Sequence, residues 1–461
     1  MMKITKINFC NLFIFNDLRT FWYKFSILIM MRRVFLFFLS FCFFFSPVFS
    51  AIDTIAVDVG ISVFKTMPLG VVPFAEKSGK IEWGEAPPHQ ILESDANLSG
   101  RFEVISSPKF DLVTFSRARA KFYVTGSAEL LANGKVKLSC YLYASQTKQL
   151  VFGENYEIAV QNVREAMHLF FDQVVFELWG ERGVASTKLA WVRKIDGVKQ
   201  VIYADYDGYR RRQATNDSAL SMMPVWALGN NKLIFVSFRN EKPQLHVKDL
   251  DTKRVRRIYT EHKQSFSPAV NPITGEILFS VIRDGKTDLY LGDAEGKKSR
   301  RISYLKSSQT SPAWSPRATE ILFTSDRGGG PQIYVMGRDG SDVRRVTFMG
   351  RYNEKAAWSP TGDRIVYTSM DNGKMNIYTC AFDGSDIVQL TSNAGNNEHP
   401  TWSPDGNLIA FASDRSGTYQ IYIMRRDGSN VTQITKQGEN TSPTWSWYDS
   451  PPPTSKKEGK K

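Results

Sequence analysis

From about residue 188 onward, short apolar segments alternate with polar turn residues in a regular pattern. In one interval the apolar segments are Pro400–Trp402, Leu408–Ala412, Gln420–Met424 and Thr432–Thr435, and Ser403-Pro404-Asp405-Gly406 separates the first two. Each segment has the length of a β-strand. Proline followed by glycine favours a tight turn, because proline fixes φ and glycine accepts a left-handed conformation. The pattern predicts units of four antiparallel strands joined by hairpins.

The tryptophan that ends the first segment of each unit gives the period of the repeat. It recurs as Trp226, Trp314, Trp358, Trp402 and Trp445, spaced 88, 44, 44 and 43 residues apart, and the missing copy falls on Val270. An independent series in the third segment has nearly the same period and consists of Tyr203, His246, Tyr290, Tyr334, Tyr378 and Tyr422. Both series indicate six units. One such unit cannot bury its own apolar face, so we expect an all-β, six-bladed β-propeller.

The two series also predict how the ring closes. Tyr203 has no tryptophan segment before it, and no further strands follow the segment that ends at Trp445. We therefore expect the C-terminal strand to complete the first sheet, which would leave no unpaired edge at the seam.

The region before the propeller lacks the repeat and mixes helical and strand patterns, so residues 51–187 are predicted to form an α/β domain ahead of a propeller at 188–449. Apolar residues at four-residue intervals indicate helices, and Asn133-Gly134 is a hairpin signal. The predicted elements are strands Thr54–Gly60 and Val71–Phe74, helix His89–Ser99 ended by Gly100, hairpin strands Tyr123–Leu130 and Lys135–Ala144, and helix Val163–Trp179 ended by Gly183.

The first 50 residues have the pattern of an extension followed by an export signal. Arg32-Arg33 precede an apolar core, Val34–Phe45, and the residues before Ala51 predict cleavage after Ser50. The core is short for a membrane span, although an uncleaved anchor is the alternative. Residues 1–30 fit neither a signal nor a domain, so translation is expected to start at Met30 or Met31. Residues 450–461 form a basic, proline-containing tail that is predicted to be disordered.

Charge and cysteine content limit the kinds of binding site and cross-link that the sequence predicts. The chain has a net charge of +13, and its first 50 residues contain six basic side chains and one acidic one, which leaves +8 for the rest. Apart from Arg210–Arg212 these basic residues are scattered, so we expect a solvated surface and no nucleic-acid site. Cys140 and Cys380, the cysteines that remain after signal cleavage, are predicted to be buried apolar residues.

Motifs of catalysis are incomplete. Gly60–Phe64 lacks the last glycine of a Gly-x-Ser-x-Gly nucleophile motif, and the histidines lack the spacing of a zinc helix. Asp205-Tyr206-Asp207-Gly208 is better explained as a hairpin turn than as a calcium loop. The triplets Ser325–Arg327 and Ser413–Arg415 share one phase of the repeat, so we interpret them as structural. No enzyme activity, cofactor or metal is predicted.

Six blades leave a central channel, and polar residues just before the tryptophan segments are expected at its mouth. They are either solvated loops or, as a ring, a site for a peptide or protein. Glu354, Glu398 and Glu439 could converge on the axis, so a hydrolase or a protein that binds peptidoglycan or sugar remains the alternative. The mouth segments are Gln264–Ser267, Gln309–Ser311, Asn353–Lys355, Asn396–His399 and Glu439–Ser442.

The order of motifs resembles the TolB family of exported propellers. The blade motifs Trp402–Gly406 and Leu408–Arg415 are shared with other propellers. The order in which the motifs follow one another along the chain is more specific to this family. The resemblance covers residues 51–449. The chain departs from the family pattern at Val270, at Ala227–Gly229 and in its long basic tail. The succession runs Asn97–Phe102, Arg164–His168, Gly183, Lys188–Val192 and then six blades.

The resemblance implies a non-enzymatic periplasmic scaffold of the Tol-Pal system, peripheral to the envelope membranes, that supports outer-membrane integrity and constriction at division. It implies that the lipoprotein Pal binds at the channel mouth and that TolA binds through about Ala51–Phe64. Carried over by position, the Pal contacts would be Gln264, Ser267, Thr310, Ser311, Glu398 and His399.

Overall fold

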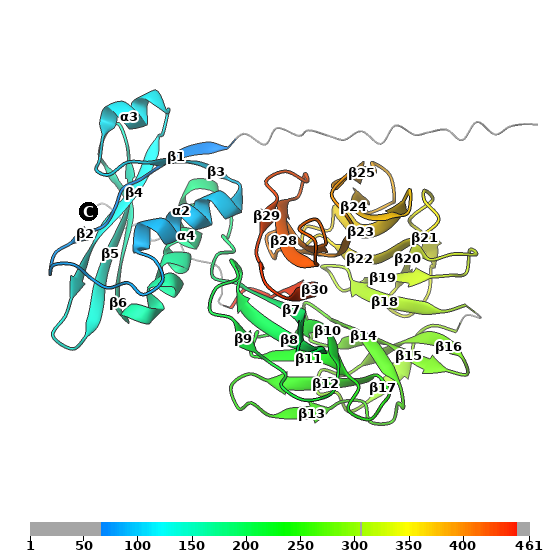
Figure 1. The fold of residues 1–461 in the computed structure, drawn as a ribbon. Helices are drawn as coiled ribbons and strands as arrows, with labels where there is room; N and C mark the ends of the chain where they lie inside the picture. The colour runs from blue at the N-terminus through cyan, green and yellow to red at the C-terminus, as the bar shows by residue number, and fades with distance from the viewer. Residues whose placement is uncertain (1–65, 305–306, 450–461) are drawn as a thin grey trace, which may run out of the picture. The chain divides into compact units, whose positions relative to one another are not determined.

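The computed structural model describes residues 66–304 and 307–449 (Figure 1). The predicted export signal, the strand predicted at Thr54–Gly60, the segment Ala51–Phe64 and the tail at 450–461 lie outside the described residues. None of the helices in the described part of the chain is long and apolar enough to span a bilayer.

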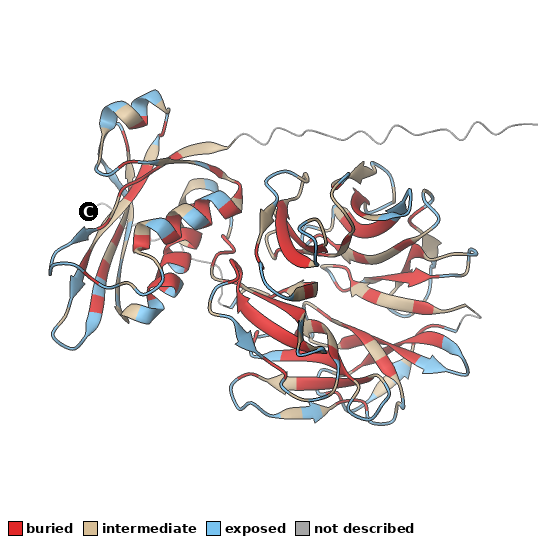
Figure 2. Ribbon diagram, viewed as in Figure 1, coloured by how far each residue is buried: buried red, intermediate tan, exposed pale blue. Residues whose placement is uncertain are grey.

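The N-terminal part is an α/β domain built on one mixed sheet with strand order β3-β1-β4-β5-β6, and β2 pairs with β4. Strand β1 is parallel to β3 and β4, whereas β4, β5 and β6 are antiparallel. Helices α2 and α4 bury apolar side chains together with the sheet (Figures 1 and 2). The elements are β1 Met67–Val71, β2 Ala75–Glu76, α2 Pro88–Ser99, β3 Phe102–Ser106, α3 Leu112–Arg117, β4 Phe122–Leu130, β5 Lys135–Ala144, β6 Leu150–Ala159 and α4 Val163–Trp179, the last preceded by a 3-10 turn at Val160–Asn162.

Helix α4 has the predicted bounds, but Gly180 and not Gly183 ends it, because Gly180 is the first glycine after the helix and takes a left-handed φ of 71°. The strand predicted at Val71–Phe74 lies at Met67–Val71, since Pro73 has no N–H for the ladder. Strands β3 and β6 and helix α3 were not predicted.

The C-terminal part is the predicted propeller, with six four-stranded sheets. One sheet has the order β30-β7-β8-β9, which confirms that the C-terminal strand closes the ring. Its strands are β30 Glu439–Trp445, β7 Lys188–Ile195, β8 Val198–Asp205 and β9 Arg212–Gln213. The other sheets are β10 Ser221–Trp226, β11 Lys232–Ser237, β12 Gln244–Asp249 and β13 Val255–Arg257; β14 Ser265–Val270, β15 Ile277–Arg283, β16 Lys286–Gly292 and β17 Ser299–Arg301; β18 Gln309–Trp314, β19 Glu320–Ser325, β20 Gln332–Gly337 and β21 Arg344–Arg345; β22 Asn353–Trp358, β23 Arg364–Asp371, β24 Lys374–Ala381 and β25 Val388–Gln389; β26 Asn397–Trp402, β27 Leu408–Ser413, β28 Gln420–Arg425 and β29 Thr432–Gln433.

The repeated tryptophans hold neighbouring blades together. Trp402, at the end of β26, is buried against Ile409 and Phe411 of its own blade and Val366 of the preceding blade. Its indole N–H donates to the carbonyl oxygen of Ala357 in that preceding blade, at 3.2 Å. Each blade therefore covers the apolar face of the next one, as the repeat predicted.

The Ser-Asp-Arg triplets are structural, as predicted. The Arg415 guanidinium lies over the rings of Phe411 and Tyr422, which stack across β27 and β28. Its Nε donates to the buried Ser413 hydroxyl at 3.0 Å. The triplet therefore caps an aromatic cross-strand pair at the end of the blade.

Candidate functional site

The innermost strand of every blade contains a β-bulge, and this bulge shapes the central channel. In β26 the register with β27 shifts between Glu398 and Thr401, and His399 within the bulge has a left-handed φ of 55°. Such a backbone is uncommon for a residue other than glycine, and bulges re-aim side chains. The equivalent residues of all six blades share this conformation, with φ between 50° and 55°; we call Met223, Ser267, Ser311, Lys355, His399 and Ser442 the bulge ring.

The bulge ring lines one end of the channel. It surrounds a cavity of about 210 Å³, and a second cavity of about 380 Å³ lies toward the tryptophan ends of the same strands. The two cavities share Val225, Ala269, Ala313, Thr401 and Thr444, so they meet along the channel. Serine, lysine and histidine side chains line part of the first cavity, whereas tryptophans line the second.

Two of the ring residues bring nitrogen bases into the channel. Burial lowers the pKa of the Lys355 ammonium. Burial, together with the charges of Lys355 and Lys199, lowers the pKa of His399 to about 3, so this imidazole is neutral at neutral pH. The backbone N–H of His399 donates to Thr368 Oγ1 of the preceding blade at 3.2 Å. The channel therefore offers one lysine amine and one neutral imidazole among serine and methionine side chains.

Two of the three carboxylates that could serve a hydrolase accept hydrogen bonds from tyrosine hydroxyls. Tyr419 donates to Glu398 at 2.5 Å, and Tyr352 donates to Glu354 at 3.0 Å. The third carboxylate, Glu439, lies 3.8 Å from the Lys194 ammonium. Burial raises the pKa of Glu398, and the charge of Glu354 adds to this. These contacts hold the carboxylates within the scaffold.

The structure brings three of the six predicted contact residues into the bulge ring. Ser267, Ser311 and His399 belong to it, and Thr310 and Glu398 directly precede it in the same strands. Gln264 lies outside the ring, one residue before β14.

The segments expected to be loops at the mouth are in fact the first residues of the innermost strands. Several of their polar side chains are buried and fasten neighbouring blades. Asn353 Nδ2 donates to Gln332 of the preceding blade at 2.9 Å. Asn397 Nδ2 likewise lies 3.4 Å from Asn376 of the blade that precedes its own. The sequence pattern left these positions as either solvated loops or a binding mouth, because each strand was predicted to begin at the proline.

Met223, Lys355 and Ser442 were not among the predicted site residues. The signal was present, because each lies a whole repeat of 43 or 44 residues from a selected serine or from His399. Their common backbone conformation appears only in the structure.

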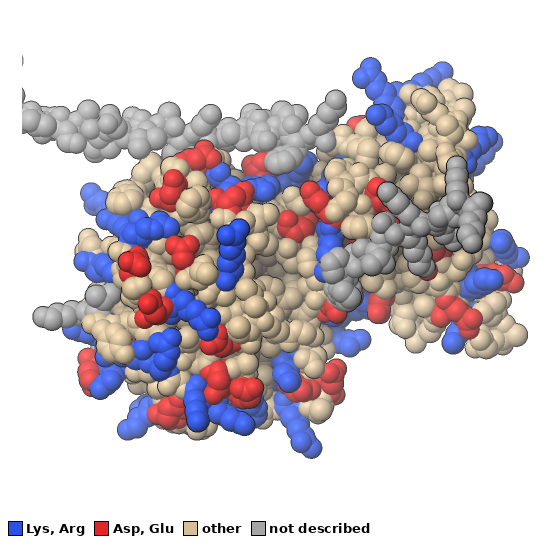
Figure 3. All heavy atoms as spheres, turned by 180° about the vertical axis from the view of Figure 1, so that it is seen from behind, with Lys and Arg blue, Asp and Glu red and all other residues tan. Residues whose placement is uncertain are grey.

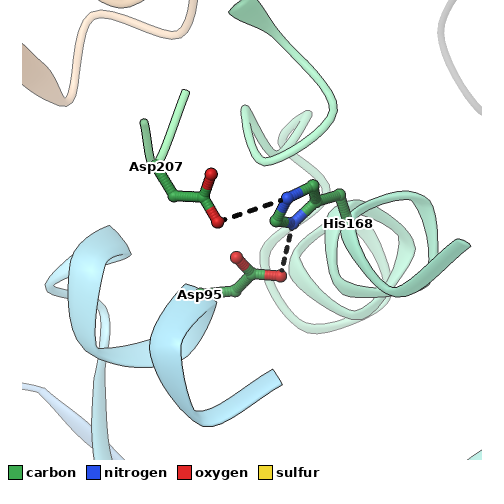
Figure 4. A group of neighbouring side chains, drawn as sticks. All are labelled: Asp95, His168 and Asp207. Carbon is green, nitrogen blue, oxygen red and sulfur yellow. Dashed lines mark hydrogen bonds and ion pairs between the residues drawn. The ribbon is translucent and has the colours of Figure 1, made fainter. Parts of the chain in front are cut away.

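A second candidate site is a buried cluster of charged side chains where the N-terminal domain meets the propeller (Figure 4). The two nitrogens of His168 in α4 face two carboxylates: Nδ1 lies 2.9 Å from Asp95 in α2, and Nε2 lies 3.5 Å from Asp207 of the propeller. Asp207 also accepts a hydrogen bond from Arg164 at 2.5 Å, and Tyr206 donates to Asp95 at 2.9 Å. Asp207 lies in the Asp205–Gly208 turn, which is a hairpin as predicted.

Cationic side chains already pair with the carboxylates of this cluster. The oxygen and nitrogen atoms of Asp95, His168 and Asp207 lie within 4.8 Å of one another, so these residues could hold a cation by distance alone. The Arg164 guanidinium pairs with Asp207 and also with Glu85 at 2.9 Å. The Asp95 carboxylate, opposing burial, raises the pKa of His168 to about 9. These pairings favour an ion cluster that joins the domains.

Comparisons with known proteins agree with this architecture. The family model described as the TolB beta propeller domain matches residues 176–377 and 357–451, together more than half of the chain. The Tol-Pal system protein TolB of Methylobacillus flagellatus is 26% identical over 211 residues, which are 44% of this chain and 48% of that protein. The chain thus matches about half the length of this curated relative.

A solved structure extends the likeness to the N-terminal domain. The crystal structure of TolB from Acinetobacter baumannii superposes with a TM-score of 0.71 and 23% identity, covering 83% of this chain and 96% of that one. At this identity the likeness concerns the fold, an α/β domain followed by a six-bladed propeller. From the repeat, the closed ring and the family model together, we conclude that this chain belongs to the TolB β-propeller family.

Proposed function

We propose that this protein is a non-enzymatic periplasmic scaffold of the Tol-Pal system that binds the lipoprotein Pal at the bulge-ring end of its channel. TolA would bind through about Ala51–Phe64, which lies outside the described residues. In this role the protein supports outer-membrane integrity and constriction at division. The likeness to the Tol-Pal system protein TolB of Methylobacillus flagellatus supports the assignment to the Tol-Pal system.

The observation that carries the proposal is the bulge ring. Six residues other than glycine hold a left-handed backbone at one level of the channel. A strained backbone of this kind persists where the surrounding structure enforces it, and it is concentrated at functional sites. A rigid ring that directs varied side chains into one opening suits recognition of a protein loop.

Calorimetric titration of the chain from Ala51 onward with the soluble domain of Pal from the same organism tests the proposal. We expect tight binding that weakens in a Glu398→Ala/His399→Ala variant with an unchanged melting temperature. A Glu320→Ala/Arg344→Ala variant is the matched control, because it removes an exposed pair of opposite charges 3.6 Å apart, far along the blade from the bulge ring. Equal weakening in both variants would exclude the ring as the site, and no binding to wild type would refute the Pal assignment.

The TolA segment and the Pal site are proposed to be coupled. Coupling requires that both ligands bias the same two states of the protein. Deletion of residues 51–64 should then change the Kd for Pal by several-fold, as typical coupling energies predict. An unchanged Kd would show that the two sites act independently.

A further inference from the structure

The end of the N-terminal sheet that includes helix α3 forms a compact tip. It consists of residues 109–121, which contain α3, and residues 144–150, which form the turn between β5 and β6. The two segments lie side by side, because the backbone N–H of Ser145 donates to the Lys121 carbonyl oxygen at 2.8 Å. We call these residues the basic tip.

A small aromatic core makes this tip rigid. Phe115 of α3 is buried and stacks on Tyr123 with ring centroids 5.7 Å apart, and Tyr123 stacks on Tyr143 at 5.3 Å. Phe110 packs against Tyr123 at 4.6 Å. The surface of the tip is therefore preorganised, although α3 has only six residues.

The surface charge of the basic tip is almost entirely positive. Its single carboxylate, Asp111, caps α3 by accepting hydrogen bonds from Thr114 Oγ1 and the Val113 N–H, and these bonds lower its pKa. Within the described part of the chain, the five cations form no ion pair with a carboxylate. Figure 3 shows basic side chains over this end of the domain, at the upper right. The five exposed cations are Lys109, Arg117, Arg119, Lys121 and Lys148.

Two apolar side chains stand among these cations. Leu112 is 39% exposed and Val113 is 56% exposed, both in the first turn of α3. Lys148 extends over the Phe110 ring, with its ammonium 5.1 Å from the centroid. The tip thus presents exposed aliphatic groups together with five cations that pair with no carboxylate of the described residues.

We propose that the basic tip docks on the surface of an anionic lipid bilayer. Clustered lysines and arginines near the surface are attracted to anionic headgroups, and apolar side chains beside them can enter the headgroup boundary. An acidic protein would also attract the cations, but it would not require the exposed Leu112 and Val113 of the same tip. The inference rests on the N-terminal domain alone and is independent of the proposed Pal site.

Sedimentation with lipid vesicles tests this inference on the full chain. Wild-type protein should bind vesicles of phosphatidylglycerol and phosphatidylcholine at low ionic strength, bind phosphatidylcholine alone much less, and dissociate as salt is added. A Lys109→Glu/Lys121→Glu variant should lose at least about tenfold in affinity, since two attractive charges become repulsive. A Lys286→Glu/Lys374→Glu variant changes the net charge equally at exposed propeller hairpins and should bind like wild type.

Three results would overturn the inference. In the first, wild-type protein does not bind the anionic vesicles. In the second, the Lys109→Glu/Lys121→Glu variant binds them as tightly as the matched control. In the third, the protein binds polyglutamate but not the vesicles. The last result would assign the tip to an acidic protein partner. A Val113→Ser variant adds a readout of apolar contact, and it should weaken vesicle binding without changing the melting temperature.

Discussion

The contacts between blades follow the repeat, whereas the contacts between the two domains add a buried ion cluster to a shared apolar core. Between blades, Trp402 packs on Val366 and the same apolar arrangement recurs at nearly every blade. Between domains, Asp207 of the propeller faces His168 and Arg164 of α4 in a cluster that the repeat does not reproduce among the described residues. Apolar contacts between blades can recur wherever the sequence motif recurs. A buried ion cluster instead depends on four particular side chains, and the protein loses stability when one of them is removed.

The largest expected effect concerns the apolar contact. Trp402→Ala should lower the free energy of unfolding by about 3–5 kcal/mol, because it leaves a cavity between two blades. Denaturant unfolding would measure this loss. Phe382→Ala is the control, since this aromatic ring is 51% exposed and should change stability by less than about 0.5 kcal/mol. Equal stability of the Trp402 variant and wild type would show that the tryptophan does not hold the blades together.

Breaking the ion cluster should have the next largest effect. Asp207→Asn keeps the shape of the side chain but leaves Arg164 and His168 with one carboxylate fewer, so we expect a loss of about 2–3 kcal/mol in unfolding free energy. Asp217→Asn is matched to it, because Asp217 pairs with Arg239 at a partly exposed site and should cost less than about 1 kcal/mol. Similar losses in both variants would contradict a special role for the buried cluster.

The cluster also predicts how stability depends on pH. The pKa of His168 is about 9 in the folded protein and 6.5 for an ordinary histidine, so its charged form stabilises the fold. This stabilisation is complete below pH 6.5 and is lost as pH rises through 9, by about 2 kcal/mol between pH 7 and 9. Unfolding midpoints measured across this range should fall in wild type and stay nearly level in His168→Gln. Parallel curves for the two proteins would be the contrary outcome.

Removing a polar contact of the repeat should have the smallest effect on the free energy of unfolding. The Ser403 hydroxyl accepts a hydrogen bond from the Leu408 N–H at 2.9 Å, and the equivalent residue of another blade is Ala227. Ser403→Ala should therefore lower the unfolding free energy by only about 0.5–1.5 kcal/mol and keep the turn. Loss of the folded state in this variant would mean that the blades tolerate fewer departures from the repeat than Ala227 indicates.

The candidate channel site could be predicted in part. The period placed Ser267, Ser311 and His399 at equivalent positions before the tryptophan segments. The bulge that turns them into the channel was not predictable, because an apolar pattern of period two does not show where an extra residue enters a ladder. Lys355 lies one repeat of 44 residues from Ser311 and from His399, and the common backbone conformation shows that it belongs to the ring.

By itself, the sequence determined the elements that repeat: the six blades, the tryptophan contacts between them and the closing strand, since each is enforced by the same local pattern of apolar and turn residues. Only the tertiary structure decided which singular residues meet. Asp95, His168 and Asp207 come from α2, α4 and a propeller turn, and the cations of the basic tip come from two separate segments. The physical reason is that contacts between residues far apart along the chain depend on how whole elements pack, and a pattern of neighbouring residues does not encode that packing.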